Sequence, residues 1–132
     1  MSVDSARERA LEIADRIESL GVVSVRRFFG GASLVVDGVQ FGFVMKGSLY
    51  LRVDDTSRSA FEALGGTPFA YAGGSRTVTV ASYYEAPDAI LEDAEQLRHW
   101  AAAAHRAARL GRRDGGRRRM TGKQRKRPES EV

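Results

Sequence analysis

The amino-acid sequence predicts an α+β domain of two layers, in which helices pack on an antiparallel sheet. The predicted order is helix, three strands, helix, two strands, helix. Two observations support this fold class. Apolar residues recur at helical spacing near both ends of the chain, and short runs rich in β-branched and aromatic residues alternate with glycine turns between them. A chain of 132 residues is long enough for one hydrophobic core and too short for two.

The first helix is predicted over residues 5–20, because apolar residues recur there at intervals of four and three. Ser5 and Glu8 match the S-x-x-E capping box that begins a helix, and Gly21 stands where a glycine ends one. A closing helix begins near Pro87 and keeps the same spacing to the end of the domain. Its carboxylates gather at its start and its arginines at its end, as the helix dipole favours.

A three-stranded antiparallel meander is predicted between residues 22 and 53. Asp37-Gly38 separates two apolar runs and is a strong signal of a two-residue hairpin turn, and Lys46-Gly47 indicates a second hairpin. Residues 24–29 lead into the meander as a candidate edge segment, with Gly30-Gly31 as a bend or bulge.

The second half of the domain is predicted to add a short helix and two strands. Residues 54–56 (Asp-Asp-Thr) offer N-caps for a helix that places Phe61 inward and ends at Gly65-Gly66. Residues 68–71 and 77–84 are the two strands, and a glycine-rich turn joins them.

Apolar residues of the meander fall on both faces of the predicted sheet, although the helices of a two-layer domain cover one. Two explanations stay open. Either a bulge, wrapped strand ends or helices on both sides alter the pattern, or a second subunit or partner covers one face. If the tight turns set the register, one face holds Leu34, Val36, Val39, Phe41, Phe43, Met45 and Tyr50, and the other holds Val35, Val44, Leu49, Leu51 and Val53.

The formal net charge of +4 conceals two regions of opposite sign. Residues 1–105 hold ten basic and fourteen acidic residues, a balance of −4, whereas residues 106–132 hold eleven and three, a balance of +8. We therefore predict a folded domain over residues 1–110 and a disordered basic tail over residues 111–132. The tail either solubilises the protein or contacts nucleic acid, through Arg112, Arg113, Arg117, Arg118, Arg119, Lys123, Arg125, Lys126 and Arg127.

The sequence offers no catalytic, cofactor-binding or metal-ligating residues that we can identify. The absence of Cys excludes disulfides and thiolate metal sites, and His99 and His105 lack the spacing of a helical zinc pair. We therefore expect no enzyme activity and no cofactor. The sequence also contains no apolar run of membrane-spanning length and no signal peptide, so we expect a cytoplasmic protein that does not bind membranes.

Six motifs stand in an order and spacing that resembles a known family. They are Arg26-Arg27-Phe28-Phe29-Gly30-Gly31, Leu34-Val35-Val36-Asp37-Gly38, Phe41-Gly42-Phe43-Val44, Leu49-Tyr50-Leu51-Arg52-Val53-Asp54-Asp55, Pro68-Phe69-Ala70-Tyr71 and Ser82-Tyr83-Tyr84-Glu85-Ala86-Pro87. Together they are similar to the N-terminal domain of the TfoX/Sxy family, over roughly residues 8–108. The resemblance implies the same α+β order of elements. The namesakes of the family regulate natural competence with the cyclic-AMP receptor protein and carry a helical C-terminal domain after this one. Here we expect the basic tail in place of that domain.

The resemblance implies a non-catalytic regulatory or adaptor protein that acts through protein–protein contacts, in regulation of the transcription or competence type. The alternative is a nucleic-acid-associated protein, in which the tail binds DNA or RNA nonspecifically and the domain forms a homodimer. The partners expected are therefore a regulatory protein, nucleic acid at the tail and a second copy of the chain. The candidate docking residues are Arg26, Arg27, Phe28, Gly30, Gly31, Tyr83 and Tyr84.

Overall fold

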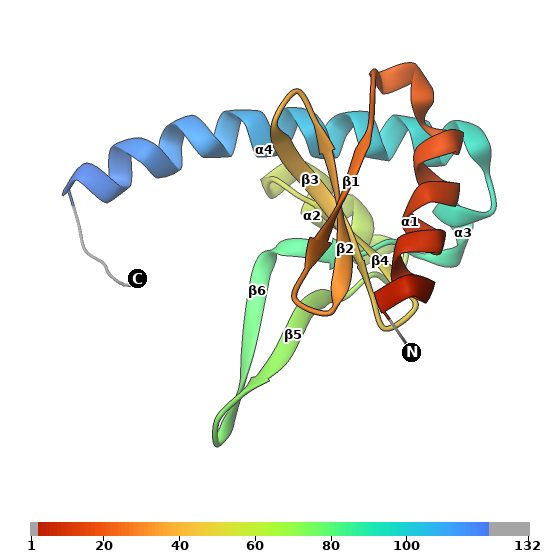
Figure 1. Ribbon diagram of the computed structural model, residues 1–132. Coiled ribbons are helices and arrows are strands. Elements are labelled where there is room, and N and C mark those ends of the chain that lie inside the picture. Colours follow the sequence, from red (N-terminus) through yellow and green to blue (C-terminus); the bar gives the residue numbers. More distant parts are fainter. Residues whose placement is uncertain (1–2, 122–132) are drawn as a thin grey trace.

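The computed structural model describes residues 3–121, and it describes side chains over residues 5–111. One antiparallel sheet of six strands, in the order β1-β2-β3-β4-β6-β5, forms one layer, and helices form the other. Figure 1 shows α4 running along the sheet and beyond it, whereas the β5–β6 hairpin projects from the body. The elements are α1 (Val3–Arg16), the 3₁₀ turn η1 (Glu18–Leu20), β1 (Ser24–Phe28), β2 (Gly31–Val36), β3 (Val39–Met45), β4 (Ser48–Arg52), α2 (Asp55–Ala63), β5 (Pro68–Gly73), β6 (Arg76–Glu85), α3 (Asp88–Leu91) and α4 (Ala94–Thr121).

The α+β class and the antiparallel sheet are confirmed, with one strand more than the predicted meander. The segment expected at the edge is a full strand, β1, which pairs with β2 from Ser24 opposite Val35 to Phe28 opposite Gly31. Gly30 belongs to the turn between these strands, with φ of +84°, and Gly31 already lies in β2. Three successive hairpins therefore connect β1 to β4.

The predicted helix caps are confirmed at one helix and wrong at another. The Asp54 carboxylate accepts the Ser57 N–H at 2.9 Å, and the Ser57 hydroxyl accepts the Asp54 N–H at 2.9 Å, so a capping box begins α2. In contrast, α1 is already helical at Val3, so Ser5 lies inside the helix and does not cap it. Gly21 closes η1, with φ of +130° and its N–H donating to the Glu18 carbonyl at 3.0 Å.

A β-bulge in β3 overturns the predicted division of the two sheet faces. Leu34 pairs with Gly42, but the next residue, Val35, pairs with Gln40, which leaves Phe41 as an extra residue without an opposite number. A bulge of this kind shifts side-chain alternation by one residue. The helix-covered face therefore combines residues of both predicted faces. Those from one predicted face are Leu34, Val36 and Phe41, and those from the other are Val44, Leu49, Leu51 and Val53. Phe43, Met45 and Tyr50 turn to the opposite face.

The core lies between the sheet and helices α1, α2 and α4. Ile13 of α1, Ile17 just after α1 and Phe61 of α2 fill it with large side chains. Helix α4 contributes mostly alanines, whose small size lets the helix pack close to the sheet. A ring nitrogen of His105 lies 3.0 Å from the Val36 carbonyl oxygen and ties α4 to the end of β2.

Helix α4 continues past the predicted domain boundary. Its backbone is helical to Thr121, so residues 111–121, predicted to be disordered, extend the helix. Gly111 and Gly115-Gly116 disfavour helix, but arginine favours it and no proline interrupts the segment before residue 128, so the helix continues through these glycines. Residues 122–132 of the predicted tail lie outside the described residues. Among the described residues, no helix is long and apolar enough to cross a membrane.

Replacing Gly31 with alanine tests how closely β2 and β3 approach. A Cβ at Gly31 would overlap the Val44 carbonyl oxygen, whereas a Cβ at Gly30 would meet no atom within 4 Å. We expect Gly31→Ala to lower the free energy of unfolding by about 1–3 kcal/mol, as overpacking does. Gly30→Asn is the control and should lower it by less than about 1 kcal/mol, because Asn tolerates positive φ. Urea unfolding followed by circular dichroism measures both, and equal losses would contradict the close approach.

Candidate functional site

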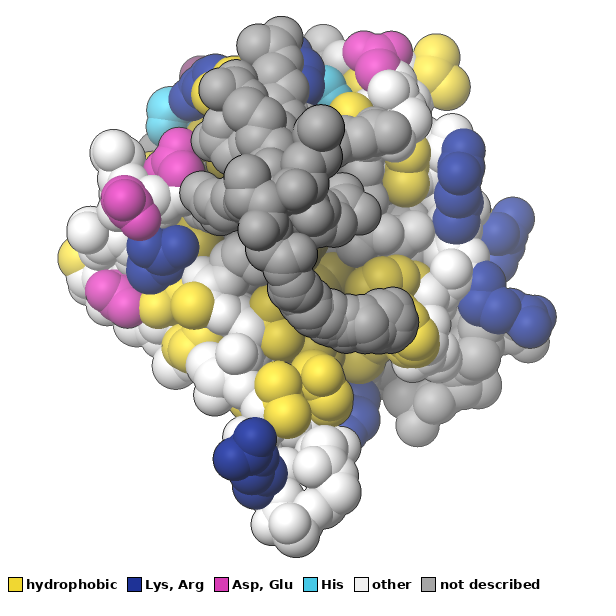
Figure 2. Space-filling view, turned by 90° about the vertical axis from the view of Figure 1, so that its left-hand side faces the viewer, with side chains coloured by type: hydrophobic (Ala, Val, Ile, Leu, Met, Phe, Trp, Pro, Cys, Tyr) yellow, Lys and Arg dark blue, Asp and Glu magenta, His cyan; other side chains and the backbone are white. Residues whose placement is uncertain are grey.

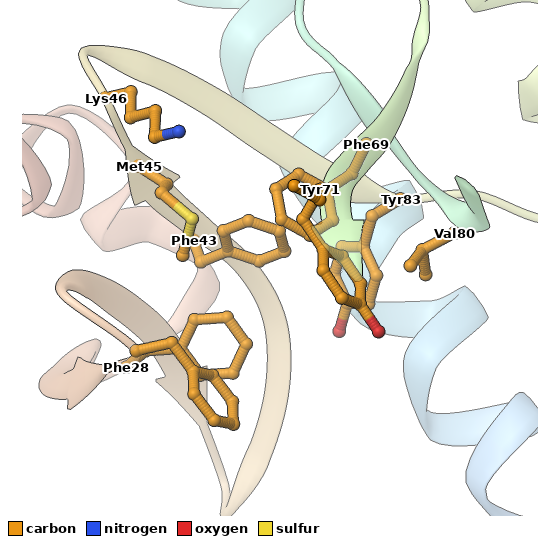
Figure 3. Close-up of a pocket in the computed structure, with 10 residues that line it drawn as sticks. Phe28, Phe43, Met45, Lys46, Phe69, Tyr71, Val80 and Tyr83 are labelled. Atoms are coloured by element: carbon orange, nitrogen blue, oxygen red, sulfur yellow. The ribbon is translucent and has the colours of Figure 1, made fainter. Parts of the chain in front are cut away.

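The sheet face opposite the core carries a groove lined by aromatic side chains. Its volume is about 620 Å³, and its lining comes from both ends of the sheet. Figure 3 shows Phe43 in the middle, with Phe28 on one side and Phe69, Tyr71 and Tyr83 on the other. The full lining consists of Phe28, Phe29, Phe43, Met45, Lys46, Phe69, Tyr71, Ala72, Val80 and Tyr83.

Phe43 forms the floor of this aromatic groove. Its ring centroid lies 4.9 Å from that of Phe28, 5.1 Å from that of Tyr50, 5.0 Å from that of Phe69 and 5.1 Å from that of Tyr83. With 2% of its surface exposed, Phe43 is as buried as a core residue although it lies outside the core. Aromatic pairs at these distances stabilise one another by about 0.5–1.5 kcal/mol each, so the four contacts hold the Phe43 ring in place.

The groove is concave because the sheet curves strongly between β3 and β5. These strands are three steps apart in the sheet order, which corresponds to about 14 Å in a flat sheet. The Phe43 and Phe69 rings are nevertheless 5.0 Å apart. The cause is a break in register between β5 and β6: Pro68 pairs with Tyr84, but Phe69 pairs with Val80. This irregularity brings the projecting hairpin over the groove face.

Two aromatic rings at the rim are exposed to solvent. Phe29, in the β1–β2 turn, is 86% exposed, and Tyr71, on β5, is 49% exposed. Phe29 also has φ of +45°, a left-handed conformation that bulky residues rarely adopt. The β2–β3 and β3–β4 turns repeat this pattern of two residues with positive φ, with Asp37 and Lys46 in the first position. Aspartate suits that position, whereas phenylalanine is strained in it.

The charged side chains around the aromatic groove are mostly basic. Lys46 lines the groove, and Arg26 lies on the same face because it pairs with Ser33, which pairs with Phe43. The Arg52 guanidinium lies 5.9 Å from the Tyr83 ring centroid. Among the described strand residues, Glu85 is the one acidic residue, and it accepts a hydrogen bond from the Ser48 hydroxyl at 2.7 Å. In Figure 2, hydrophobic side chains gather above the projecting hairpin, with Lys and Arg side chains below and to the right of this area and both acidic and basic side chains at its left edge.

Three tyrosines hold their protons more tightly than usual: Tyr50 and Tyr83 on the groove face, and Tyr84 on the core face. Burial raises the pKa of Tyr83, and burial together with the negative charge of Glu85 raises the pKa of Tyr50. The hydrogen bond that Tyr84 donates to the Glu62 carboxylate at 2.5 Å raises the pKa of Tyr84. A tyrosine is uncharged at neutral pH even at its ordinary pKa of 10.0, so these phenols add no charge to the groove face.

The structure distributes the predicted docking residues over three environments. Phe28 and Tyr83 line the aromatic groove, and Arg26 lies on its face. Arg27 is exposed on β1, and Gly30 and Gly31 form the turn and strand start beside them. Tyr84 points the other way, into the core, because successive strand residues face opposite sides.

Sequence reasoning did not single out most of the groove. The predicted register places Phe43, Met45 and Tyr50 on one face together with core residues, because a bulge was only one of the open explanations and its position at Phe41 was not predicted. Phe69 and Tyr71 carried a usable signal, since they alternate with small residues in β5.

The predicted nucleic-acid contacts are not located by the structure. Residues 112–119 belong to the helical backbone of α4, but their side chains lie outside the described part of the chain, as do residues 123–127 altogether. Within the described residues, no group of three His, Asp or Glu side chains could hold a metal ion.

The fold and the groove together define a class of protein: a small α+β domain whose antiparallel sheet has one face in the core and a concave aromatic face outside it. A comparison of the chain with models of protein families identifies its family. The TfoX N-terminal domain matches residues 15–108, and the chain belongs to that family. A comparison with curated proteins found no match.

Replacing Phe29 tests the strain at the groove rim. Phe29→Asn places a residue that tolerates positive φ in the turn and removes a ring that is mostly in solvent, so we expect the free energy of unfolding to rise by about 1 kcal/mol. Tyr71→Asn is the control, because Tyr71 lies in a regular strand with no strain to relieve, and it should not stabilise the protein. Thermal or urea unfolding measures the difference. A Phe29→Asn variant less stable than the wild type would show that the ring contributes more than the strain removes.

The raised tyrosine pKa values predict a loss of stability in alkali. Above the ordinary tyrosine pKa of 10.0, the unfolded chain releases phenolic protons that the folded chain still holds, so rising pH favours unfolding. We expect the free energy of unfolding to fall above about pH 10, and to fall less steeply in Tyr83→Phe and Tyr50→Phe. Urea unfolding across this pH range measures the slopes, and slopes identical in the variants and the wild type would contradict the prediction.

Proposed function

We propose that the protein is a non-catalytic regulatory or adaptor protein that acts through protein–protein contacts, with the aromatic groove as its docking surface. The observation that carries this proposal is the concave aromatic face that the helices leave uncovered. Contiguous apolar surface on a small domain is typical of an interaction site.

The rim residues support a docking role over a purely structural one. Phe29 keeps a large ring in solvent at a strained backbone position, where smaller residues would fit the turn better. Tyr71 stands exposed on β5. Aromatic residues and arginine are enriched among the residues that dominate binding energy in interfaces, and both types are present on this face.

Membership of the TfoX N-terminal domain family supports the regulatory part of the proposal. Since the namesakes of the family regulate natural competence, we extend the proposal to transcriptional regulation of that kind, carried out in the cytoplasm. The second candidate function, nonspecific binding of DNA or RNA by the basic tail, rests on the balance of +8 over residues 106–132.

Affinity capture with the full chain separates the two functions. We expect the wild type to retain specific proteins from its own cells after nuclease treatment, and the double variant Phe29→Asn/Tyr71→Ser to lose them. Leu11→Ser is the matched control: Leu11 is 43% exposed on α1, away from the groove, and its loss should leave capture unchanged.

A second variant, with the lysines and arginines of residues 112–127 changed to glutamine, tests the tail. Capture that survives this change and the nuclease supports the adaptor function. The nucleic-acid function would be favoured instead if capture were lost in the tail variant or after nuclease treatment, and if Phe29→Asn/Tyr71→Ser captured the same proteins as the wild type.

A further inference from the structure

We propose that the aromatic groove binds an acidic segment of a partner protein, anchored by large apolar side chains. This inference rests on the proposed docking function and adds the chemistry of the partner. The apolar floor and the charge around the groove each restrict what can bind there.

The floor of the groove accepts apolar groups. Rings and aliphatic side chains make up nearly all of its lining, and the Tyr83 hydroxyl already donates to the Gln40 carbonyl oxygen at 3.5 Å. A polar side chain placed against Phe43 would lose its hydrogen bonds to water without replacement, whereas a leucine or an aromatic ring would gain buried contact. A volume of about 620 Å³ lies within the usual range of binding sites and leaves room for more than one anchor.

The charge of the groove face selects an acidic partner. Arg26, Lys46 and Arg52 form no ion pair with any described residue, and the one acidic strand residue, Glu85, is hydrogen-bonded to Ser48. The Nε atom of Arg52 is buried without a hydrogen-bond partner among the described residues, and its guanidinium packs against Gly111 of α4. Arg52 therefore adds positive charge behind the groove, whereas Arg26 and Lys46 are the cations that a partner can contact. Unpaired guanidinium and ammonium groups beside an apolar groove attract carboxylates, which add specificity and faster association.

A second copy of the chain fits this face less well. In a symmetric dimer the same patch meets itself, so Arg26, Lys46 and Arg52 of each copy would approach like charges of the other. Such juxtaposition is unfavourable, and the groove face offers only Glu85 to offset it.

Single-stranded nucleic acid also fits less well than an acidic peptide. It binds by stacking successive bases on open ring faces. Most rings in the groove pack against one another, with Phe43 stacked on Tyr50 at an interplanar angle of 21°. The two exposed rings, Phe29 and Tyr71, stand on different elements at the rim. An extended peptide can instead lie between them, and the end strands β1 and β5 offer backbone groups for pairing.

An unbiased peptide selection tests the inference. A random peptide library displayed on phage is selected on the full chain, and binders that also bind Phe29→Asn/Tyr71→Ser are removed. We expect the remaining peptides to combine several Asp or Glu with at least two large apolar residues. A synthetic copy of the most enriched peptide, followed by fluorescence polarisation, should bind the double variant about tenfold more weakly than the wild type.

Charge variants and competitors complete the test. Arg26→Gln/Lys46→Asn should weaken the same peptide several-fold at low salt and less at high salt, because salt screens exposed charges. Leu11→Ser should bind as the wild type does. Groove-dependent peptides without net negative charge, no groove-dependent peptides at all, or displacement of the peptide by equimolar oligothymidine would each overturn the inference. Groove-dependent capture of a cellular protein together with any of these results would leave the adaptor function in place and reject only the acidic partner.

Discussion

The β-bulge at Phe41 is the feature on which the rest of the structure depends. Before it, Leu34 and Val36 point to the helices, and without it Phe43, Met45 and Tyr50 would follow them into the core. The extra residue lets β3 bury Phe41 and Val44 against the helices and direct Phe43 to the opposite face. Both faces of the sheet carry apolar residues, where an antiparallel sheet of this size usually presents a polar face to water, and the inserted residue decides which of them face the helices and which face outward.

The two apolar faces are packed by different means. On the helix side, alanines of α4 and aliphatic residues of α1 form a close-packed core. On the other side, rings pack against rings around Phe43, and the irregular pairing of β5 with β6 brings Phe69 to them. The second face therefore holds together without a helix to cover it. Its outer rings at Phe29 and Tyr71 stay in solvent, which is the arrangement expected of a surface that a partner completes.

Charge is divided between regions in a way that composition hides. The net charge of +4 comes from the balance of +8 in residues 106–132, whereas residues 1–105 are acidic overall. Yet within that acidic region the strands carry one acidic residue, so the sheet face around the groove is locally basic. A calculated net charge therefore describes neither surface, and the groove has an electrostatic preference opposite to that of the domain that contains it.

The sequence alone determined most of the elements and their order, because local signals specify them: helical spacing of apolar residues, the Asp54 cap of α2, and the glycines after Asp37 and Lys46 in two hairpin turns. Its six motifs also indicated the family. The tertiary structure alone decided which face each strand residue occupies, because a bulge depends on how two strands pair and has no local signature here. For the same reason only the tertiary structure brought Phe28, Phe43 and Phe69 together, from three strands that are not neighbours in the sheet.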